Sequence, residues 1–308
     1  MIKDCGRIAV FDSGMGGLDV AAALSRTLPN ENLIYLGDNA RVPYGTKSAE
    51  MVKSYTYEAA YRLLNHNLKA LVIACNTASA AVDIDTLSAE LKIPVFGMIQ
   101  AGVLACQKAM STKQNHSYEI VTLATPGTIR SGAYQSALNS KFPDAHQQAI
   151  ACPIFVPLVE MGWETHPLST EIIKAQLVGL SNSDALPQSN SKAPNLSLAI
   201  NQNERIYLLG CTHYPMMRES IEQALHELHQ SHDTLRSIPF HCIDGADSVS
   251  CLVKQDLQKL NLLRQSSKSG SHSVYLTDKL NGTHSTELAL RFWHKRGGLG
   301  ELNIQHAP

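Results

Sequence analysis

Short apolar runs alternate along this chain with longer amphipathic stretches. The apolar runs are typical of buried strands, and we expect strands at 8–11, 33–36, 70–74, 94–98, 119–124, 149–152, 206–209, 239–243 and 273–276. The stretches between them predict helices at about 18–27, 48–66, 77–91, 99–111, 128–138, 168–180, 216–229 and 285–295. Turn residues predict loops at 39–47, from 157–160 onward, and through the Ser-, Asn- and Pro-rich segment 181–204.

Strands that alternate with helices indicate parallel sheets covered on both faces. The chain also shows a faint internal repeat, because in each half one strand ends in a polar turn and a later strand ends in cysteine. Asp12 precedes Cys75 by 63 positions and Thr125 precedes Cys211 by 86, and the excess nearly equals the length of segment 181–204. The alternative is the rough periodicity that any α/β protein shows.

We therefore expect an α/β protein of two similar, doubly wound parallel-sheet domains. They would be related by a pseudo-twofold axis, with the active site between them. The first domain is expected to be discontinuous, with residues 1–98 and 215–308, and the second to comprise residues 99–214. In such sheets ligands bind beyond the carboxyl ends of the strands, where most of the polar clusters of this chain fall.

Composition and charge exclude several classes of protein. Of 308 residues, 44% are hydrophobic and 17% charged, and the net charge is -1, so a globular core is feasible and no basic cluster indicates a nucleic-acid partner. Neither a secretory signal nor an apolar run long enough to span a membrane is visible, so we expect a cytoplasmic protein without a membrane partner. The seven cysteines are irregularly spaced without a C-x-x-C pair, which argues against a disulfide framework and a metal site.

Two cysteines are candidates for reactive thiols. Cys75 and Cys211 each follow an apolar strand and precede a predicted helix, whose amino terminus favours an anion. A thiolate in that position is a nucleophile, a metal ligand or a base. Each residue taken alone also has a structural interpretation: a buried small cysteine, a hydrogen-bonded histidine at position 213, or a helix cap at Asp12.

Four motifs in order resemble glutamate racemases, within the aspartate/glutamate racemase superfamily. They are Asp12-Ser13-Gly14-Met15-Gly16-Gly17, Pro43-Tyr44-Gly45, Ala74-Cys75-Asn76-Thr77-Ala78-Ser79 and Gly210-Cys211-Thr212-His213-Tyr214-Pro215. Residues 125–134 and 157–160 are similar to further segments of the family. Two departures are the length of segment 181–204 and Arg205, which stands where many members carry an acidic residue.

The resemblance implies racemisation of glutamate by two thiols without a cofactor, and in particular without pyridoxal phosphate. It assigns Cys75 to the D-enantiomer and Cys211 to the L-enantiomer, with Asp12 supporting Cys75, and His213 and Glu160 supporting Cys211. The residues implied to bind the amino acid are Asp12, Ser13, Tyr44, Gly45, Asn76, Thr77, Thr212 and His213. A homodimer and a supply of D-glutamate for peptidoglycan are also implied.

Three alternatives remain at this point. The first is a racemase for aspartate or for several amino acids, although the form of the 210–215 motif favours glutamate. The second is a cysteine hydrolase with Cys211 as nucleophile and His213 as base, which would leave Cys75 without a function. The third is an amino-acid-binding protein, which would not need two thiols.

Overall fold

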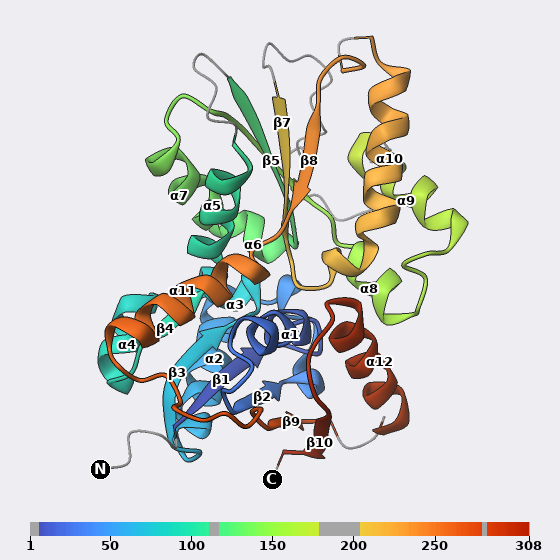
Figure 1. Ribbon diagram of the computed structural model, residues 1–308. Coiled ribbons are helices and arrows are strands. Elements are labelled where there is room, and N and C mark those ends of the chain that lie inside the picture. The colour runs from blue at the N-terminus through green and yellow to red at the C-terminus, as the bar shows by residue number, and fades with distance from the viewer. Residues whose placement is uncertain (1–5, 111–116, 179–203, 234, 279–281, 308) are drawn as a thin grey trace. The chain divides into compact units, whose positions relative to one another are not determined.

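The computed structural model describes residues 6–110, 117–178, 204–233, 235–278 and 282–307, without the side chains of 282 and 283. The chain divides into two compact units, one of Met1–Gly102 with Gly245–Pro308 and the other of Val103–Asp244. Each unit contains a parallel sheet with helices packed against it (Figure 1). Two α/β parallel sheets are the fold class that the sequence predicts, and this prediction is confirmed. The pseudo-twofold relation and a site between the domains stay predictions.

The sheet of the first unit has six strands in the described residues, in the order β10-β9-β2-β1-β3-β4, with every neighbouring pair parallel. The strands are β1 (Arg7–Asp12), β2 (Leu33–Gly37), β3 (Leu68–Ile73), β4 (Val95–Gly97), β9 (His272–Leu276) and β10 (Leu302–His306). The central strands β1, β2 and β3 are buried along almost their whole length. Their continuous apolar character is what a parallel sheet covered on both faces requires.

Helices cover this first sheet in two groups. They are α1 (Leu18–Thr27), α2 (Ala49–Leu64), α3 (Asn76–Ala81), α4 (Ile84–Leu91), α11 (Ala246–Lys259) and α12 (Gly282–Lys295), with 3-10 turns η1 (Asn39–Arg41) and η2 (Tyr44–Thr46). Helix α1 packs with α11 and α12, and α2 packs with α3 and α4. Alternate strand residues such as Ala9, Phe11 and Ile73 share a core with Leu63 of α2 and Leu87 of α4.

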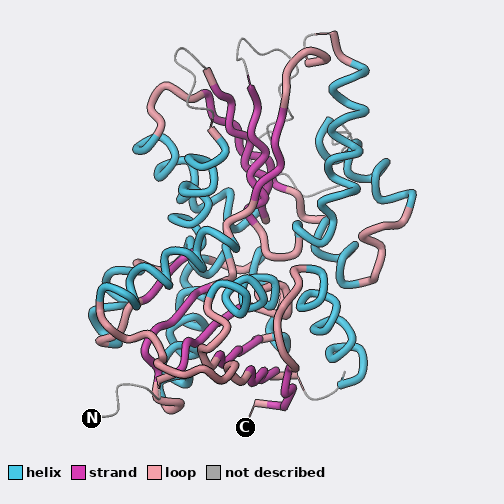
Figure 2. The backbone as a smooth tube through the Cα atoms, in the orientation of Figure 1, coloured by secondary structure: helices cyan, strands magenta, loops and turns pink. Residues whose placement is uncertain are grey.

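The sheet of the second unit has four described strands in the order β6-β5-β7-β8, again all parallel. The strands are β5 (Tyr118–Ala124), β6 (His146–Ala151), β7 (Glu204–Gly210) and β8 (Phe240–Ile243). The helices are α5 (Met98–Ala109), which begins in the first unit, α6 (Pro126–Ser131), α7 (Ala133–Lys141), α8 (Phe155–Glu160), α9 (Pro167–Val178) and α10 (Arg218–Ser231), preceded by the 3-10 turn η3 (Tyr214–Met217). Helix α7 lies to one side of the strands and α9 and α10 to the other, as the tube in Figure 2 also shows.

A buried ion pair joins β5 and β7 near their amino ends. Arg205 and Glu119 are both 0% exposed, stand directly opposite each other in the register, and are linked from Arg205 Nε to Glu119 Oε2 at 2.7 Å. The other oxygen of Glu119 lies 3.0 Å from His146 Nδ1, and Arg205 also donates to the Tyr207 hydroxyl at 3.2 Å. Buried charges need such partners, because an unpaired charge in the core is strongly destabilising.

Several predicted elements differ from the structure. The helix expected at 77–91 is two helices, α3 and α4, because the chain is extended at Val82 and the Asp83 side chain caps α4 by accepting from Thr86 N at 2.7 Å. The helix expected at 128–138 is likewise α6 and α7, separated by Gly132 at φ +66°. Residues 157–160 do not open a loop; they complete helix α8. Strand β10 was not predicted, since the exposed edge strand Leu302–His306 lacks a continuous apolar run.

The division of the chain also differs from the expected one. Residues 215–244 belong to the second unit, because β8 pairs with β7 and α10 packs on α9. The helix expected from 216 starts as the 3-10 turn η3 and becomes α-helical at Arg218. The polar segment expected as a loop at 181–204 lies outside the described residues except for Glu204, which begins β7.

Each sheet has a point where the chain reverses its direction across the strands. From β1 the chain passes through α1 to β2, and then through α2 to β3 on the other side of β1. From β5 it passes to β6, and later to β7 on the other side of β5. Ligands of open α/β sheets bind at the carboxyl ends of the strands at such a reversal. These positions are occupied by residues 12–17 and Cys75 in the first unit, and by Thr125 and Cys211 in the second.

Candidate active site

The Cys75 thiol lies just beyond the carboxyl end of β3. Cys75 is the N-cap of α3, and its sulfur accepts a hydrogen bond from Ala78 N at 3.5 Å. The thiol is 5% exposed and donates to Ser13 Oγ at 3.4 Å. The Ala74 amide bonds to the Phe11 carbonyl at 2.8 Å, which continues the β1–β3 pairing to the edge of the site. The structure thus brings together Ser13 and Cys75, two residues of the predicted site.

Asp12 ends β1 next to this thiol. Its carboxylate is 0% exposed and accepts from Gly14 N at 3.0 Å. The Tyr35 hydroxyl donates to the Gly14 carbonyl at 2.8 Å and lies beside the Asp12 carboxylate; burial and the charge of Asp12 raise the pKa of Tyr35 well above its usual range. Gly17 has no room for a side chain, because a Cβ there would lie 2.5 Å from Asp12 Cβ. The loop after β1 therefore folds tightly around the carboxylate.

Four further residues of the predicted site belong to the same unit. Asn76 and Thr77 form the first turn of α3, and Tyr44 and Gly45 begin η2, and all four are buried. The Tyr44 hydroxyl donates to Asp38 Oδ2 at 2.6 Å. Burial and this carboxylate raise the pKa of Tyr44, so its phenol stays neutral at any ordinary pH.

The second thiol, Cys211, is one residue beyond the carboxyl end of β7. It is 7% exposed and is followed by the buried residues Thr212 and His213. The residues after it form the 3-10 turn η3, so Cys211 does not cap an α-helix as Cys75 does. Thr125, at the end of the paired strand β5, caps α6 and shares a 3.0 Å hydrogen bond with the Thr128 hydroxyl.

His213 links Cys211 to Glu160. Its Nε2 lies 3.3 Å from Glu160 Oε1, and its ring is hydrogen-bonded to the Cys211 sulfur. Burial lowers the pKa of His213, but the hydrogen bonds and negative charges of Cys211 and Glu160 outweigh burial and raise that pKa to about 10. A buried histidine with two such partners is held as a cation at neutral pH. The arrangement therefore places a cationic proton donor beside the Cys211 sulfur.

Helix α8 brings Glu160 to this histidine. Phe155 of α8 packs edge-on against Tyr214 of η3, with ring centroids 5.0 Å apart, and the Tyr214 hydroxyl donates to the Cys152 carbonyl at 2.7 Å. The sequence expectation of a loop at 157–160 missed this support, although it included Glu160 among the site residues. The signal available was the apolar spacing of Phe155, Leu158 and Val159, which are the buried residues of α8.

Burial keeps three further thiols of the described residues in the neutral form. Burial raises the pKa of Cys106 to about 12, and burial together with the nearby Cys211 raises that of Cys152 further. Burial likewise raises the pKa of Cys242 to about 12. These thiols stay protonated near neutral pH and fit the structural interpretation of a small buried residue.

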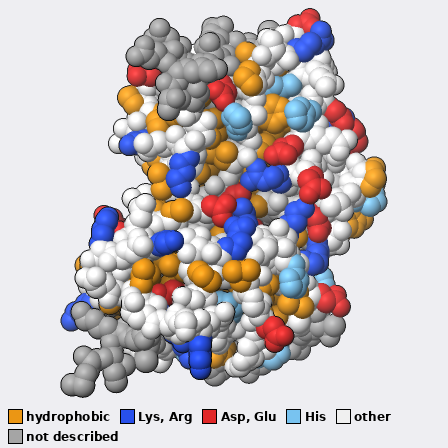
Figure 3. Space-filling view, viewed as in Figure 1, with side chains coloured by type: hydrophobic (Ala, Val, Ile, Leu, Met, Phe, Trp, Pro, Cys, Tyr) orange, Lys and Arg blue, Asp and Glu red, His pale blue; other side chains and the backbone are white. Residues whose placement is uncertain are grey.

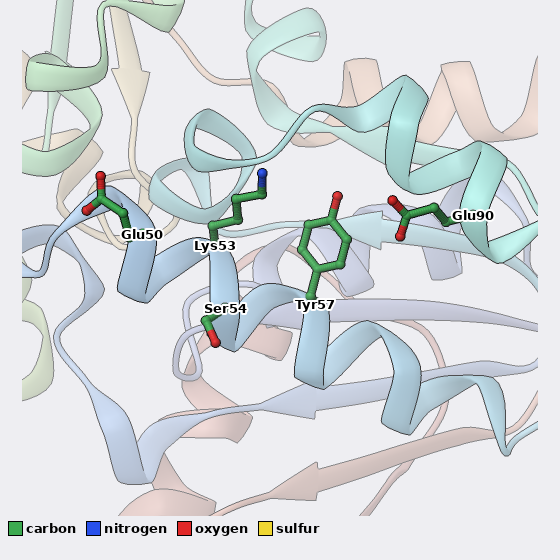
Figure 4. A pocket seen from close by; sticks show the side chains of 5 residues that line it. All are labelled: Glu50, Lys53, Ser54, Tyr57 and Glu90. Atoms are coloured by element: carbon green, nitrogen blue, oxygen red, sulfur yellow. The ribbon is translucent and has the colours of Figure 1, made fainter.

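A shallow surface hollow of about 450 Å³ lies outside the predicted site. Glu50, Lys53, Ser54 and Tyr57 of α2 and Glu90 of α4 line it (Figure 4). Acidic and basic side chains lie interspersed on the face of the molecule in Figure 3.

Within the described ranges, no group of three or more His, Cys, Asp or Glu residues is placed to hold a metal ion. Nor is any helix in the described part of the chain long and apolar enough to cross a membrane.

Comparison with known proteins identifies the family. The sequence profile of the Asp/Glu/Hydantoin racemase family matches residues 16–180, more than half of the chain. A glutamate racemase of Geobacter metallireducens is 36% identical over 273 residues, which cover 88% of this chain and 87% of that protein. The chain belongs to the glutamate racemase branch of this family. The family resemblance seen in the motifs, and with it the isomerase class, is confirmed.

Other glutamate racemases agree with this membership in sequence and in structure. A relative in Lysinibacillus sphaericus is 41% identical over 220 residues, which cover 71% of this chain and 74% of that protein. The crystal structure of a glutamate racemase isoform of Bacillus anthracis has a TM-score of 0.76 at 29% identity, covering 98% of this chain and 97% of that chain. A glutamate racemase of Francisella tularensis, solved in complex with D-glutamate, has a TM-score of 0.75 at 30% identity, with 98% of both chains covered.

Proposed function

We propose that this protein interconverts L- and D-glutamate by proton transfer at Cα, using the Cys75 and Cys211 thiols and no cofactor. The observation that carries the proposal is that each of the two parallel sheets presents one buried thiol at its own strand reversal, beside a titratable partner. Inversion of a stereocentre by proton transfer needs a base on one face and an acid on the other, and two like groups suit mirror-image substrates.

The proposed reaction balances as a transfer of two protons. In the L-to-D direction the Cys211 thiolate takes the Cα proton, which leaves the electron pair on Cα and makes Cys211 a thiol. The Cys75 thiol then gives its proton to the opposite face of Cα and becomes a thiolate. The reverse reaction starts from the Cys75 thiolate and D-glutamate. This chemistry requires the two thiols on opposite faces of Cα.

The titratable neighbours have distinct roles in this proposal. Asp12 supports proton transfer at Cys75, from the buried position it holds beside Ser13 and Tyr35. His213 supports Cys211 as a cation, and Glu160 stabilises that cation across 3.3 Å. The side chains and amides proposed to hold the amino acid are those of Ser13, Tyr44, Gly45, Asn76, Thr77 and Thr212, with Asp12 and His213.

The relatives support glutamate as substrate, since the named matches are glutamate racemases and one was solved with D-glutamate. We extend the proposal to a role in supplying D-glutamate for peptidoglycan, in the cytoplasm, by a homodimer. The support for these three points is the family membership. Sedimentation at several protein concentrations tests the dimer.

The deciding experiment is racemisation in deuterated water, starting from L-glutamate and purified enzyme without added cofactor. We expect optical rotation to fall to zero while deuterium enters Cα. If optical rotation and deuterium content change with L-aspartate but not with L-glutamate, the proposed mechanism holds and the substrate is aspartate. If neither substrate changes, the racemase proposal is wrong, and a cysteine hydrolase or binding protein takes its place.

A further inference from the structure

The carboxylate of Asp38 is the centre of a hydrogen-bonded cluster that the motifs do not indicate. Asp38 follows β2, is 1% exposed, and its amide continues the sheet by bonding to the Asp12 carbonyl at 3.0 Å. One carboxylate oxygen, Oδ2, accepts from Tyr44 Oη at 2.6 Å and from Arg41 Nε at 2.6 Å. The other, Oδ1, accepts from Thr277 Oγ1 at 3.0 Å. Hydrogen bonds to a buried carboxylate are among the stronger ones in proteins.

The Tyr44 phenol is engaged inside this cluster. Tyr44 is 1% exposed, and its single hydroxyl proton goes to Asp38. The ring is buried against Phe11 and Tyr55, with centroids 6.4 Å and 5.7 Å away. The phenol is therefore an anchor for η2, and its proton is not available to a substrate. The hydrogen bonds that hold the Asp38 carboxylate, and through it the Tyr44 phenol, therefore determine the position of η2.

Thr277 completes the anchor from a distant part of the sequence. It follows β9, the neighbour of β2, and its amide bonds to the Gly37 carbonyl at 3.1 Å. Its hydroxyl donates to Asp38 and accepts from the Ala40 amide at 3.0 Å, so it bridges the carboxylate and η1. The next residue, Asp278, adds a bond from its amide to Asn39 Oδ1 at 2.9 Å.

Arg41 fixes the outer side of the same turn. Its guanidinium donates to Asp38 and to Glu58 Oε2 at 2.7 Å, and it lies 4.1 Å from the centroid of the Tyr55 ring. Those contacts are partly exposed, and exposed ion pairs contribute little to stability. The bond from Thr277 is part-buried like the bond from Arg41, but it reaches the other carboxylate oxygen, Oδ1, while Arg41 and Tyr44 both bond to Oδ2. Thr277 therefore holds the side of the Asp38 carboxylate that Arg41 and Tyr44 leave free to turn.

We propose that Thr277 is a positioning residue for the substrate turn, acting through Asp38 on the Tyr44–Thr46 segment. The proposal rests on the proposed function, because it takes the backbone at Tyr44 and Gly45 as part of the glutamate site. The C-terminal segment thereby sets substrate affinity without taking part in the proton transfers.

The test compares Thr277→Val with Thr277→Ser. Valine keeps the shape and removes the hydroxyl, and serine restores the hydroxyl. For Thr277→Val we expect KM to rise about tenfold, the effect of losing one hydrogen bond to a buried carboxylate. Because L- and D-glutamate have equal free energy, KM should rise by the same factor in both directions while each kcat stays within about twofold. Thr277→Ser should return KM to near the wild-type value.

Hydrogen–deuterium exchange of residues 39–47 gives a second readout that needs no activity. We expect faster exchange in this segment for Thr277→Val and wild-type exchange for Thr277→Ser. The matched control is Thr56→Val, which removes a buried hydroxyl that bonds to the Val52 carbonyl at 2.7 Å within α2. It should change neither KM nor exchange in 39–47.

Two outcomes would overturn the proposal. One is unchanged KM and unchanged exchange in Thr277→Val; the other is a loss of kcat that serine does not restore. If wild-type enzyme fails to racemise glutamate, the proposed function fails by itself. The exchange data still decide whether Thr277 holds the 39–47 segment, and the substrate part of the proposal falls with the function.

Discussion

The two thiol sites share a strand arrangement but differ in how they hold charge. Counted from the last register pair of each sheet, Ser13 is level with Cys75, two residues beyond Phe11 and Ile73. Thr125 is level with Cys211 in the same way, one residue beyond Ala124 and Gly210. A hydroxyl residue thus stands beside each cysteine on the neighbouring strand.

The titratable group beside each cysteine, in contrast, comes from a different part of the fold in the two units. In the first unit it is Asp12, in the strand next to Cys75, and the matching position in the second unit is the apolar Ala124. In the second unit the partner is His213, two residues after the cysteine on the same segment, with Glu160 behind it. Two similar scaffolds therefore place an anion beside one thiol and a cation beside the other. Proton donation and acceptance are then supported differently at the two sites.

The largest effect is expected from removing either thiol. Cys75→Ser and Cys211→Ser should each lower racemisation by about 10³-fold or more, because an alcohol is a far weaker acid and base at neutral pH. Cys75→Ser should retain slow deuterium entry into L-glutamate without loss of rotation, and Cys211→Ser the same with D-glutamate. Mass spectrometry with polarimetry measures both.

The matched control for this pair is Cys251→Ser, which changes a partly buried thiol on α11 and should leave the rate unchanged. Full racemisation in either Cys75→Ser or Cys211→Ser would contradict a mechanism that needs both thiols.

A smaller effect, about 10²-fold in rate, is expected from Asp12→Asn and His213→Asn. The equilibrium constant of racemisation is 1, so kcat/KM must be equal for the two enantiomers and cannot show which thiol is impaired. Primary isotope effects with substrates deuterated at Cα can show this. In Asp12→Asn the step at Cys75 becomes slower, so the isotope effect should rise for D-glutamate and fall for L-glutamate. His213→Asn should show the reverse. Equal isotope effects in both variants would show that the two partners do not serve separate thiols.

The charge on His213 also predicts a pH dependence of stability. Its pKa in the folded chain is about 10, above the roughly 6.5 of an unfolded histidine, so folding favours the protonated ring. The stabilisation should be fully present below about pH 6.5 and lost as pH rises through about 10. The melting temperature of wild type minus that of His213→Asn should thus be larger at pH 6 than at pH 10. A difference that grows with pH would contradict a cationic His213.

The smallest effects should separate the two neighbouring hydroxyls. Ser13→Ala removes the acceptor of the Cys75 thiol and should slow racemisation by about tenfold. Thr125→Val removes the cap of α6 and should cost about 1 kcal/mol of unfolding free energy, with a smaller change in rate. Parallel kinetics and urea unfolding test both. If Thr125→Val slows the reaction as much as Ser13→Ala, the two hydroxyls have the same role.

The sequence was sufficient for the parts of the structure that depend on local patterns. Strands such as β1 and β7 are continuous apolar runs, and helix α1 begins and ends where the pattern predicts. Ser13, Cys75, Glu160 and His213 are all among the predicted site residues, and the structure places Ser13 beside Cys75 and Glu160 beside His213. The chemical roles of these residues stay predictions that the experiments above test.

The features that sequence reasoning missed depend on contacts between distant segments. Asp38 is not among the residues that the sequence predicts for the site, since its role depends on hydrogen bonds to Tyr44 and to Thr277, the latter 239 positions away. The expected boundary near 214 differs from the observed division, because strand pairing, not the position of a motif, assigns β8 to the second sheet. One signal was available for Asp38: polar residues that end neighbouring parallel strands meet at one edge of the sheet.

The buried ion pair of Arg205 and Glu119 fixes the register of β7 against β5, and this register determines the position of the distant Cys211 thiol. Shifting β7 by one residue against β5 would turn Arg205 to the opposite face and leave two uncompensated charges in the core. Only one alignment of the two strands therefore satisfies both charges. Because that alignment also sets Cys211 level with Thr125 at the other end of the strands, a salt bridge six residues before the cysteine fixes the position of the thiol to the nearest residue.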